Sequence, residues 1–479
     1  MTARCVMVLG TTSGAGKSWL TTALCRWYAD RGYKVAPFKA QNMSNNARVV
    51  AGGEIGSAQY FQALAARAEP DVRMNPVLLK PEHDTASQVV LMGRVDTTLT
   101  RLPWRERSAH VWPHVARALD ALRAENDVVV IEGAGSPAEI NLQASDIVNL
   151  RVARHGDARC LLVTDIDRGG AFAHLYGTWA LLPEADRALL RGFVLNKFRG
   201  DASLLAPGPQ MLQDMTGVPT VATVPMWWRH GLPEEDGVFD DRPGGASGAV
   251  RLTVAVVAYP RISNLDEFQA LKNIEGVRLV WARSPAQLQS ADWIVLPGSK
   301  HTSGDLAWLR TQGLDAAVAA HAAAGRPVLG ICGGLQMLGE ALIDPHGIDG
   351  NGPGLGLLPL VTAFEPEKTV RHTRARFGAV GGAWSALSGV EMAGYEIRHG
   401  QTAARPDLPA PLRVLPEGLG WQNAQGNVLG LYLHGLFEDS AVLQALFGAE
   451  APTLDRVFDG LAAAVERDFR PGWLASLLG

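Results

Sequence analysis

A cysteine bracketed by glycines gives the first indication of chemistry. Cys332 stands in Gly330-Ile-Cys-Gly-Gly334, at the end of the apolar run 328–331 and before a helical pattern. A strand that turns sharply into a helix in this way is a nucleophile elbow, here with cysteine in place of serine. The helix dipole and the N–H of Gly333 would favour a thiolate and an oxyanion, and Gly298, after the preceding strand, would supply the second oxyanion donor. Cys332 is therefore predicted to be a catalytic nucleophile.

A histidine is predicted to act as the base for this cysteine. His434 ends the apolar segment 428–433, from which it could be presented to Cys332 across a sheet. A single histidine is more often structural than catalytic, but of the 12 histidines it is the only one in such a setting. Next to a cysteine elbow, a catalytic role for His434 becomes the favoured interpretation.

A glycine-rich segment near the start of the chain predicts a phosphate site. Residues 10–18 read GTTSGAGKS, between an apolar strand and a helical pattern. The backbone N–H groups around Gly14 and Gly16 would cradle a polyphosphate, Lys17 would neutralise the β and γ phosphates, and Ser18 would ligate Mg²⁺. The common loop has four residues between its outer glycines and this one has five, a variant found in a group of ATP-dependent enzymes that activate carboxylates. A glycine turn that merely caps a helix is the weaker alternative.

Polar side chains at the ends of other apolar strands are candidates for the same site. Glu132 follows the run 128–131 and enters a glycine loop, so it is the second Mg²⁺ candidate, although it could be an ordinary strand-end acid. Asp165 is a third candidate ligand for metal or substrate, and Asn196 could pair with an adenine edge. For these last two residues a structural role is as likely as a functional one. The expected cofactors are ATP and Mg²⁺.

The elements needed to position these residues alternate along the chain. Short β-rich runs separated by helical patterns predict two doubly wound α/β domains with parallel sheets; the runs are residues 5–9, 34–38, 127–131, 159–164 and 192–195, then 252–258, 277–281, 293–296 and 328–331. Between them, residues 237–248 lose periodicity and gain Gly, Pro and Asp, as an exposed linker does. We predict domains at 1–237 and 251–447, a linker at 238–250, and an amphipathic helical tail at 448–479.

Composition excludes several classes of partner and location. The 479 residues carry a formal charge of −4, so no basic face is expected to bind nucleic acid or an anionic membrane. No apolar run is long enough to span a bilayer, and no signal peptide is recognised. The four cysteines are far apart and form no C-x-x-C pair, which fits a reducing compartment. We expect a cytoplasmic enzyme with small-molecule partners, and the oligomeric state is left open.

Together these motifs resemble the class I glutamine amidotransferases, in which a Cys and a His release ammonia from glutamine. The usual third member, a Glu two residues after the His, is replaced by Leu436, as in the cobyric acid and cobyrinic acid diamide synthase group. Glu438 and Asp439 are the nearby carboxylates that could orient the imidazole. Gly394-Tyr-Glu-Ile-Arg398-His399 also resembles a family stretch, with Arg398 where a histidine is expected.

The first half of the chain narrows the resemblance to the cobyric acid synthase family, over nearly the whole length. Residues 37–46 (PFKAQNMSNN) and 75–81 (NPVLLKP) look like stretches of that family, and the first domain is expected to be similar to dethiobiotin synthetase. The resemblance implies ATP-dependent phosphorylation and amidation of the b, d, e and g carboxylates of adenosylcobyrinic acid a,c-diamide. Lys39, Gln41 and Asn42 are then candidate residues for binding this corrinoid.

Three rival interpretations fit less well. A diamide synthase of the same pathway shares both sites, but the segment at Lys39 argues against it. CTP synthetase has the third catalytic Glu that is missing at Leu436. A partition-type ATPase switch would carry a second lysine where Thr12 stands and has no need of a glutaminase domain. The order of the amidations and the path of ammonia between the sites are not predicted.

Overall fold

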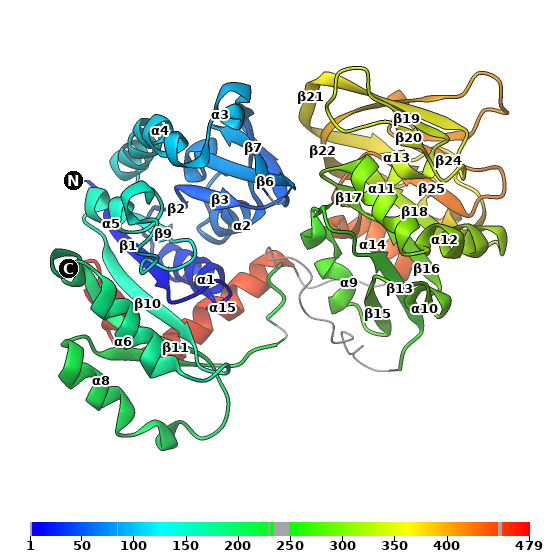
Figure 1. Cartoon of the computed structure of the whole chain (residues 1–479). Helices are drawn as coiled ribbons and strands as arrows, with labels where there is room; N and C mark the ends of the chain where they lie inside the picture. The colour runs from blue at the N-terminus through cyan, green and yellow to red at the C-terminus, as the bar shows by residue number, and fades with distance from the viewer. Residues whose placement is uncertain (1, 84, 229, 234–248, 449–452) are drawn as a thin grey trace.

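The computed structural model describes residues 2–83, 85–228, 230–233, 249–448 and 453–479. Most of the predicted linker, residues 238–248, lies outside this range. Two α/β units, each built around its own sheet, lie side by side (Figure 1). Among the described residues, no helix is both long and apolar enough to cross a membrane.

The first unit contains a six-stranded parallel sheet. Its order is β12 (Thr220–Pro225), β11 (Leu190–Phe198), β10 (Arg159–Asp165), β1 (Arg4–Gly10), β9 (Val128–Glu132) and β2 (Val35–Phe38). The β1, β9 and β10 strands are buried almost throughout, which explains their continuous runs of Val, Leu and Ile. The helices of this unit are α1 (Lys17–Ala29), α2 (Ser57–Ala65), α3 (Thr97–Arg101), α4 (Trp104–Glu125), α5 (Leu150–Gly156), α6 (Ala171–Leu181), α7 (Glu184–Arg187) and α8 (Gly208–Thr216).

Two small sheets extend the first unit beyond this parallel sheet. One contains β3 (Gln41–Met43), β6 (Val77–His83), β7 (Ala86–Leu91) and β8 (Arg94–Val95), and the other is the hairpin of β4 (Ala47–Val50) and β5 (Gly53–Gly56). Strand β4 contacts β21 (Leu360–Arg376) and β22 (Glu391–Ala404) of the second unit. The hairpin therefore forms part of the junction between the units.

The second unit contains a seven-stranded sheet that is parallel over its first five strands. Its order is β15 (Val277–Ala282), β13 (Leu252–Val257), β16 (Trp293–Leu296), β18 (Val328–Ile331), β25 (Val428–Leu431), β24 (Gly420–Gln422) and β23 (Leu412–Leu415). Its helices are α9 (Gln269–Asn273), α10 (Pro285–Gln289), α11 (Thr302–Thr311), α12 (Leu314–Ala323), α13 (Gly333–Leu338) and α14 (Ser440–Phe447). Strand β21 joins β22, β19 (Ala341–Ile343) and β20 (Gly352–Pro353) in a further sheet. Parallel α/β sheets in both units confirm the predicted fold class.

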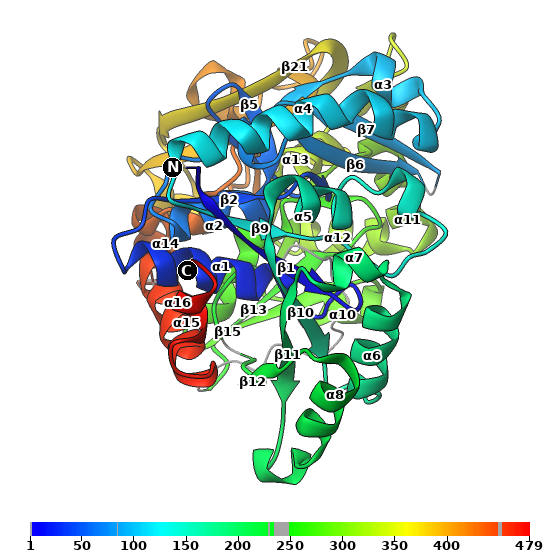
Figure 2. The same cartoon turned by 90° about the vertical axis from the view of Figure 1, so that its left-hand side faces the viewer.

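The end of the chain returns to the first unit. Helix α15 (Leu454–Asp468) lies beside α1, as both views show (Figure 1, Figure 2), and α16 (Trp473–Ser476) follows it at the end of the chain (Figure 2). Arg26 of α1 forms ion pairs with Asp455 at 2.6 Å and Asp459 at 2.8 Å, and the Tyr28 hydroxyl donates to the Leu474 carbonyl at 2.8 Å. The sequence predicted an amphipathic helix here but not its partner, which is the apolar layer over β1 and β9.

Candidate active sites

The turn at Cys332 has the strained geometry of a nucleophile elbow. Cys332 follows β18 with φ 52° and ψ −106°, a conformation that side chains other than Gly rarely adopt. A Cβ added to Gly334 would lie 1.8 Å from the Leu296 carbonyl oxygen, and one added to Gly330 would lie 2.7 Å from the Gly334 carbonyl oxygen. The glycines on both sides of the cysteine are therefore required by close backbone packing, as their spacing predicted.

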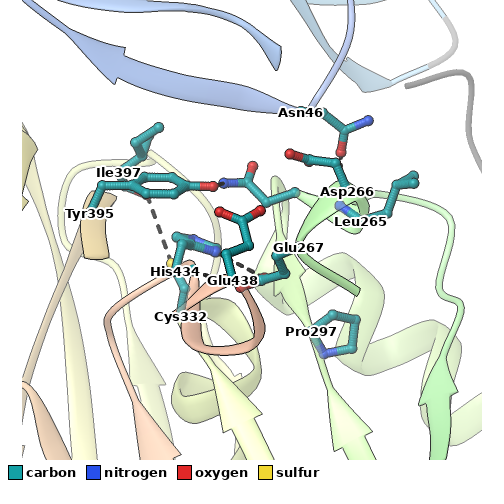
Figure 3. A network of polar contacts seen from close by, with 12 residues as sticks. Asn46, Leu265, Asp266, Glu267, Pro297, Cys332, Tyr395, Ile397, His434 and Glu438 are labelled. Carbon is teal, nitrogen blue, oxygen red and sulfur yellow. Dashed lines mark hydrogen bonds and ion pairs between the residues drawn. The ribbon is translucent and has the colours of Figure 1, made fainter. Parts of the chain in front are cut away.

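His434 and Cys332 meet at the carboxyl ends of neighbouring strands. Strands β18 and β25 pair in parallel, and His434 lies just beyond β25 (Figure 3). His434 lies close enough to Cys332 for the charge of one side chain to act on the other, and the Cys332 Sγ lies 3.8 Å from the Ile397 carbonyl oxygen. The Tyr395 ring stacks on the imidazole with the ring centroids 5.3 Å apart. The structure thus brings together the two residues that the sequence predicts to be nucleophile and base.

A third residue, Glu267, orients this imidazole. Its Oε1 lies 3.2 Å from His434 Nδ1, and its Oε2 accepts a hydrogen bond of 2.9 Å from the Gly435 N–H (Figure 3). Glu267 is completely buried in the short turn η4 (Leu265–Phe268) that follows β13 and β14 (Ile262–Ser263). It is 167 residues from His434 in the sequence, and no local pattern marks it as catalytic.

Glu438 and Asp439, which the sequence offered as partners for the imidazole, bind other groups. Glu438 accepts a hydrogen bond from the Arg48 guanidinium at 2.6 Å. Asp439 accepts hydrogen bonds from the N–H groups of Ala441 and Val442, so it caps the start of α14. The Cys–His–carboxylate arrangement is therefore completed from another part of the chain.

The surroundings of His434 favour its protonated form. Burial alone would lower its pKa, but negative charge on Cys332 and Glu267, together with hydrogen bonds to both side chains, raises the pKa of His434 to about 10. Burial raises the pKa of Glu267, and the charge of His434 opposes this rise. An imidazolium held between a sulfur and a carboxylate is suited to protonate a leaving amine.

The two glycines predicted as oxyanion donors line this site. A Cβ on Gly298, in β17 (Gly298–Ser299), would lie 2.8 Å from His434 Cε1, and one on Gly333 would lie 2.8 Å from the Ser299 nitrogen. Neither position has room for a larger side chain. Their role as donors to an oxyanion stays a prediction.

A pocket beside Cys332 is lined by residues of both units. Cys332, His434, Gln336 and Arg398 come from the second unit, and Asn45, Lys80 and Gln88 come from the first. His399 also lines it, and its Nδ1 lies 3.0 Å from the Glu365 carbonyl oxygen. The first unit therefore helps to enclose the cysteine site.

The glycine-rich loop has the form of a phosphate cradle. Gly14 and Gly16 have φ values of 70° and 102°, and α1 begins at Lys17. The Lys17 Nζ lies 3.0 Å from the Thr12 carbonyl oxygen and 3.3 Å from that of Gly135, so its charge is held over the loop. Loop, lysine and helix N-terminus fit the polyphosphate of ATP.

The two leading candidates for Mg²⁺ binding lie together. The hydroxyl of Ser18, in the first turn of α1, donates to Glu132 Oε1 at 2.9 Å, at the carboxyl end of β9. Glu132 also accepts hydrogen bonds from Lys39 at 2.8 Å and Gln62 at 2.5 Å. Burial alone would raise the pKa of Glu132, but Lys39 and the other donors lower it, so the carboxylate is ionised. One hydroxyl and one carboxylate beside a phosphate loop suit Mg²⁺, which takes few protein ligands and completes its shell with phosphate and water.

The other two strand-end candidates are already engaged with the protein. Asp165 forms an ion pair of 3.0 Å with Lys197, whose ammonium also donates to the Gly14 carbonyl at 2.8 Å. Asn196 donates to the Ala15 carbonyl at 2.9 Å, and its amide nitrogen lies where a side chain at Gly16 would be. Both residues support the phosphate loop, and neither contact requires a metal or an adenine.

The predicted corrinoid-binding residues take three different positions. Lys39 is buried on Glu132, so it belongs to the phosphate site. Asn42 is buried too, with its amide 3.2 Å from the Gln59 oxygen. Gln41 lines a cleft with Met43 and with Gly135, which contacts Lys17. Of the three, Gln41 is the one placed in an open cleft next to the phosphate loop.

Comparison with known proteins agrees with this geometry. Residues 6–235 match the family model of the CobQ/CobB/MinD/ParA nucleotide binding domain, and residues 253–442 match that of the CobB/CobQ-like glutamine amidotransferase domain. The structure and these matches define a glutamine-dependent amidotransferase joined to a P-loop nucleotide-binding domain.

Relatives of known name narrow this class to one family. The chain is 79% identical over its full length to the cobyric acid synthase of Variovorax paradoxus (strain S110), whose chain is covered completely. It is 76% identical to that of Paracidovorax citrulli (strain AAC00-1) and 73% identical to that of Polaromonas sp. (strain JS666), with at least 98% of each chain covered. The chain belongs to the cobyric acid synthase family.

Proposed function

We propose that this chain uses ATP, Mg²⁺ and glutamine to amidate the b, d, e and g carboxylates of adenosylcobyrinic acid a,c-diamide, in the cytoplasm. The observation that carries the proposal is the presence, in one chain, of a glutamine-type Cys332–His434–Glu267 site and a phosphate loop facing an ionised Glu132. The similarity to cobyric acid synthases over the full chain supports the choice of substrate.

The cysteine site would release ammonia in two steps. The Cys332 sulfur attacks the side-chain amide carbon of glutamine, and His434 gives its proton to the departing nitrogen, so that ammonia leaves a thioester. Water then attacks the thioester, His434 takes the proton of the water, and glutamate departs as the thiolate is restored. Glu267 keeps the imidazole in one orientation through both steps.

The phosphate site would prepare the carboxylate for ammonia. An oxygen of the corrinoid carboxylate attacks the γ-phosphorus of ATP, and ADP leaves. Ammonia then attacks the acyl carbon of the mixed anhydride, and phosphate leaves with the oxygen that a free carboxylate could not release. Lys17 would neutralise the phosphate charge, and Ser18 with Glu132 would hold Mg²⁺, which supplies further charge neutralisation when bound.

The cleft containing Gln41 is the best placed for the corrinoid side chain. Met43, with 56% of its surface exposed, lies at this cleft, as do Arg107, Gly135 and Ser136. Gly135 touches Lys17, so a carboxylate bound here would lie near the transferred phosphate. Replacement of Gln41 by Ala should weaken corrinoid amidation and leave glutamine hydrolysis intact.

Mass spectrometry of the corrinoid tests the whole proposal. The protein is incubated with ATP, Mg²⁺, glutamine and adenosylcobyrinic acid a,c-diamide, and a product with four new amide groups is expected. Lys17→Ala should abolish amidation with either nitrogen source, whereas Cys332→Ala should amidate only when ammonium salt replaces glutamine. An unchanged diamide with the wild-type protein would refute the proposed substrate.

A further inference from the structure

A buried arginine from the nucleotide-binding unit reaches into the surroundings of the glutaminase site. Arg48 lies on β4, and only 4% of its surface is exposed. Its Nε donates to Asp266 Oδ2 at 2.9 Å, and its Nη1 donates to Glu438 Oε2 at 2.6 Å. Both acceptors belong to the other unit, so the guanidinium is an ion-pair centre across the junction.

Each partner of Arg48 is next to a member of the catalytic group. Asp266 directly precedes Glu267 in the η4 turn, and Glu438 ends the η7 turn (Leu436–Glu438) that begins just after His434 (Figure 3). The guanidinium carbon also lies 5.1 Å from the ring centroid of Tyr395, which stacks on the imidazole. Arg48 therefore acts on the cysteine site through the side chains that surround His434.

The positive charge of Arg48 affects the pKa of the Asp266 carboxylate beside it. Asp266, Glu267 and Glu438 lie close enough for their charges to interact, and the negative charge of Glu438 raises the pKa of both Asp266 and Glu267. The charge of Arg48 opposes the rise at Asp266, as the charge of His434 does at Glu267. Without the guanidinium, two carboxylates would be left uncompensated beside Glu267, and Glu267 would take up a proton at a higher pH.

We infer that Arg48 is a positioning residue for glutamine hydrolysis, supplied by the nucleotide-binding unit. It holds the η4 and η7 turns at a fixed separation and places a positive charge between Asp266 and Glu438, so that His434 stays aligned with Cys332. Asn264 reinforces this junction, because its amide donates to the Tyr395 hydroxyl at 2.8 Å and to the Ala47 carbonyl at 3.3 Å. The inference rests on the proposed glutaminase, and it adds that the cysteine site is incomplete without a residue from the other unit.

The test compares variants of the full chain in glutamine hydrolysis over a range of pH. Arg48→Gln should lower kcat on the order of 10-fold to 100-fold, the usual effect of a small misplacement, with a much smaller change in KM for glutamine. The acidic limb of its pH profile should move to higher pH. Arg48→Lys should recover part of the loss, because it restores the charge without the planar fork.

Two further variants distinguish a role of Arg48 in positioning the cysteine site from a role in simply holding the two units together. Glu82→Gln breaks the cross-junction ion pair with Lys300, which is 2.7 Å long, and should leave the pH profile unchanged. Glu438→Gln removes a charge that raises the pKa of Glu267, so its acidic limb should move to lower pH, opposite to Arg48→Gln. If Arg48→Gln fails to fold, Glu438→Gln and Arg48→Lys still test the inference: the acidic limb should move to lower pH in Glu438→Gln and stay near its wild-type position in Arg48→Lys, which keeps the charge.

The outcomes distinguish this inference from the proposed function. If wild-type hydrolysis requires Cys332 but Arg48→Gln and Glu82→Gln behave alike, with unchanged pH profiles, Arg48 only joins the units and the inference is overturned. If wild-type hydrolysis does not require Cys332, the proposed glutaminase itself fails.

Discussion

Glu267 occupies the Nδ1 side of His434, and Cys332 lies close enough to the same ring for its charge to raise the pKa of His434. A carboxylate in this position selects one tautomer of the neutral ring and stabilises the imidazolium. In most class I sites the sequence around the histidine provides this carboxylate, and here Leu436 occupies that position. The main difference from the class pattern is therefore that the carboxylate on the imidazole comes from Glu267, far from His434 in the sequence.

Replacement of Glu267 by Gln removes the charge while keeping the size. We expect kcat for glutamine hydrolysis to fall by about 10²-fold or more, because the imidazolium loses its stabilising carboxylate. The raised pKa of His434 keeps its ring protonated until pH rises through about 10. Without the Glu267 charge that pKa falls, so the alkaline limb of the pH–rate profile should move to lower pH.

Asp439→Asn is the matched control for this change. Asp439 is also an acid near His434 in sequence, but it only caps α14 and accepts from the Ala393 N–H. It should keep the wild-type alkaline limb. An unshifted profile in Glu267→Gln, measured by glutamate release, would remove Glu267 from the catalytic group.

At the scale of elements, local sequence patterns were enough to predict the strands, loops and helices that carry the two sites. The runs around Val128 and Val328, and the loops at Lys17 and Cys332, take the predicted strand, loop and helix because burial and glycine geometry act over a few residues. Asp165 and Asn196 lie at the predicted edge of the sheet, but there they support the phosphate loop. A position at the end of a strand predicts where a side chain lies, but it does not determine which group that side chain binds.

Gly334 tests how strictly the elbow between β18 and α13 depends on backbone contact. Gly334→Ala would place a methyl group on the Leu296 carbonyl, and neither backbone segment can move without disturbing the sheet. We expect a loss of about 1–3 kcal/mol in the free energy of unfolding, together with loss of glutamine hydrolysis. Denaturant titration and glutamate release would measure these effects.

Gly177→Ala provides the comparison for that prediction. Gly177 is inside α6, and nothing lies within 4 Å of its added Cβ. An alanine there should be neutral or stabilise the protein by up to about 1 kcal/mol. Wild-type stability and activity in Gly334→Ala would show that the close approach of Leu296 is not required.

At the scale of the whole molecule, the features that sequence patterns missed are long-range contacts. Glu267 reaches His434 over 167 residues, Arg48 reaches Glu438 over 390, and Arg26 reaches Asp459 over 433. Each depends on how the two units and the final helices pack, which no window of sequence contains. The amphipathic pattern of α15 predicted a helix with a buried face, but the choice between the two units required the fold.

This arrangement predicts that α15 stabilises the unit that is distant from it in sequence. Leu461 of α15 is completely buried in the apolar layer formed with α1 and β1. Leu461→Ala should cost about 2–5 kcal/mol, mainly in the nucleotide-binding unit. After heating, ammonium-dependent amidation, which needs only the ATP site, should be lost at a lower temperature than in the wild type. Glutamine hydrolysis should fall over the same range, because unfolding of this unit withdraws Arg48 from the junction beside the cysteine site.

Leu443→Ala supplies the reciprocal case, because Leu443 of α14 is buried in the core of the glutaminase unit. It should lower the inactivation temperature of glutamine hydrolysis and spare ammonium-dependent amidation. If both variants lower both temperatures equally, the two units unfold as one and the junction around Arg48 couples them more tightly than their separate cores indicate. If Leu461→Ala lowers both temperatures and Leu443→Ala lowers only that of glutamine hydrolysis, the final helices belong to the nucleotide-binding unit in stability as well as in contact, and the cysteine site depends on that unit.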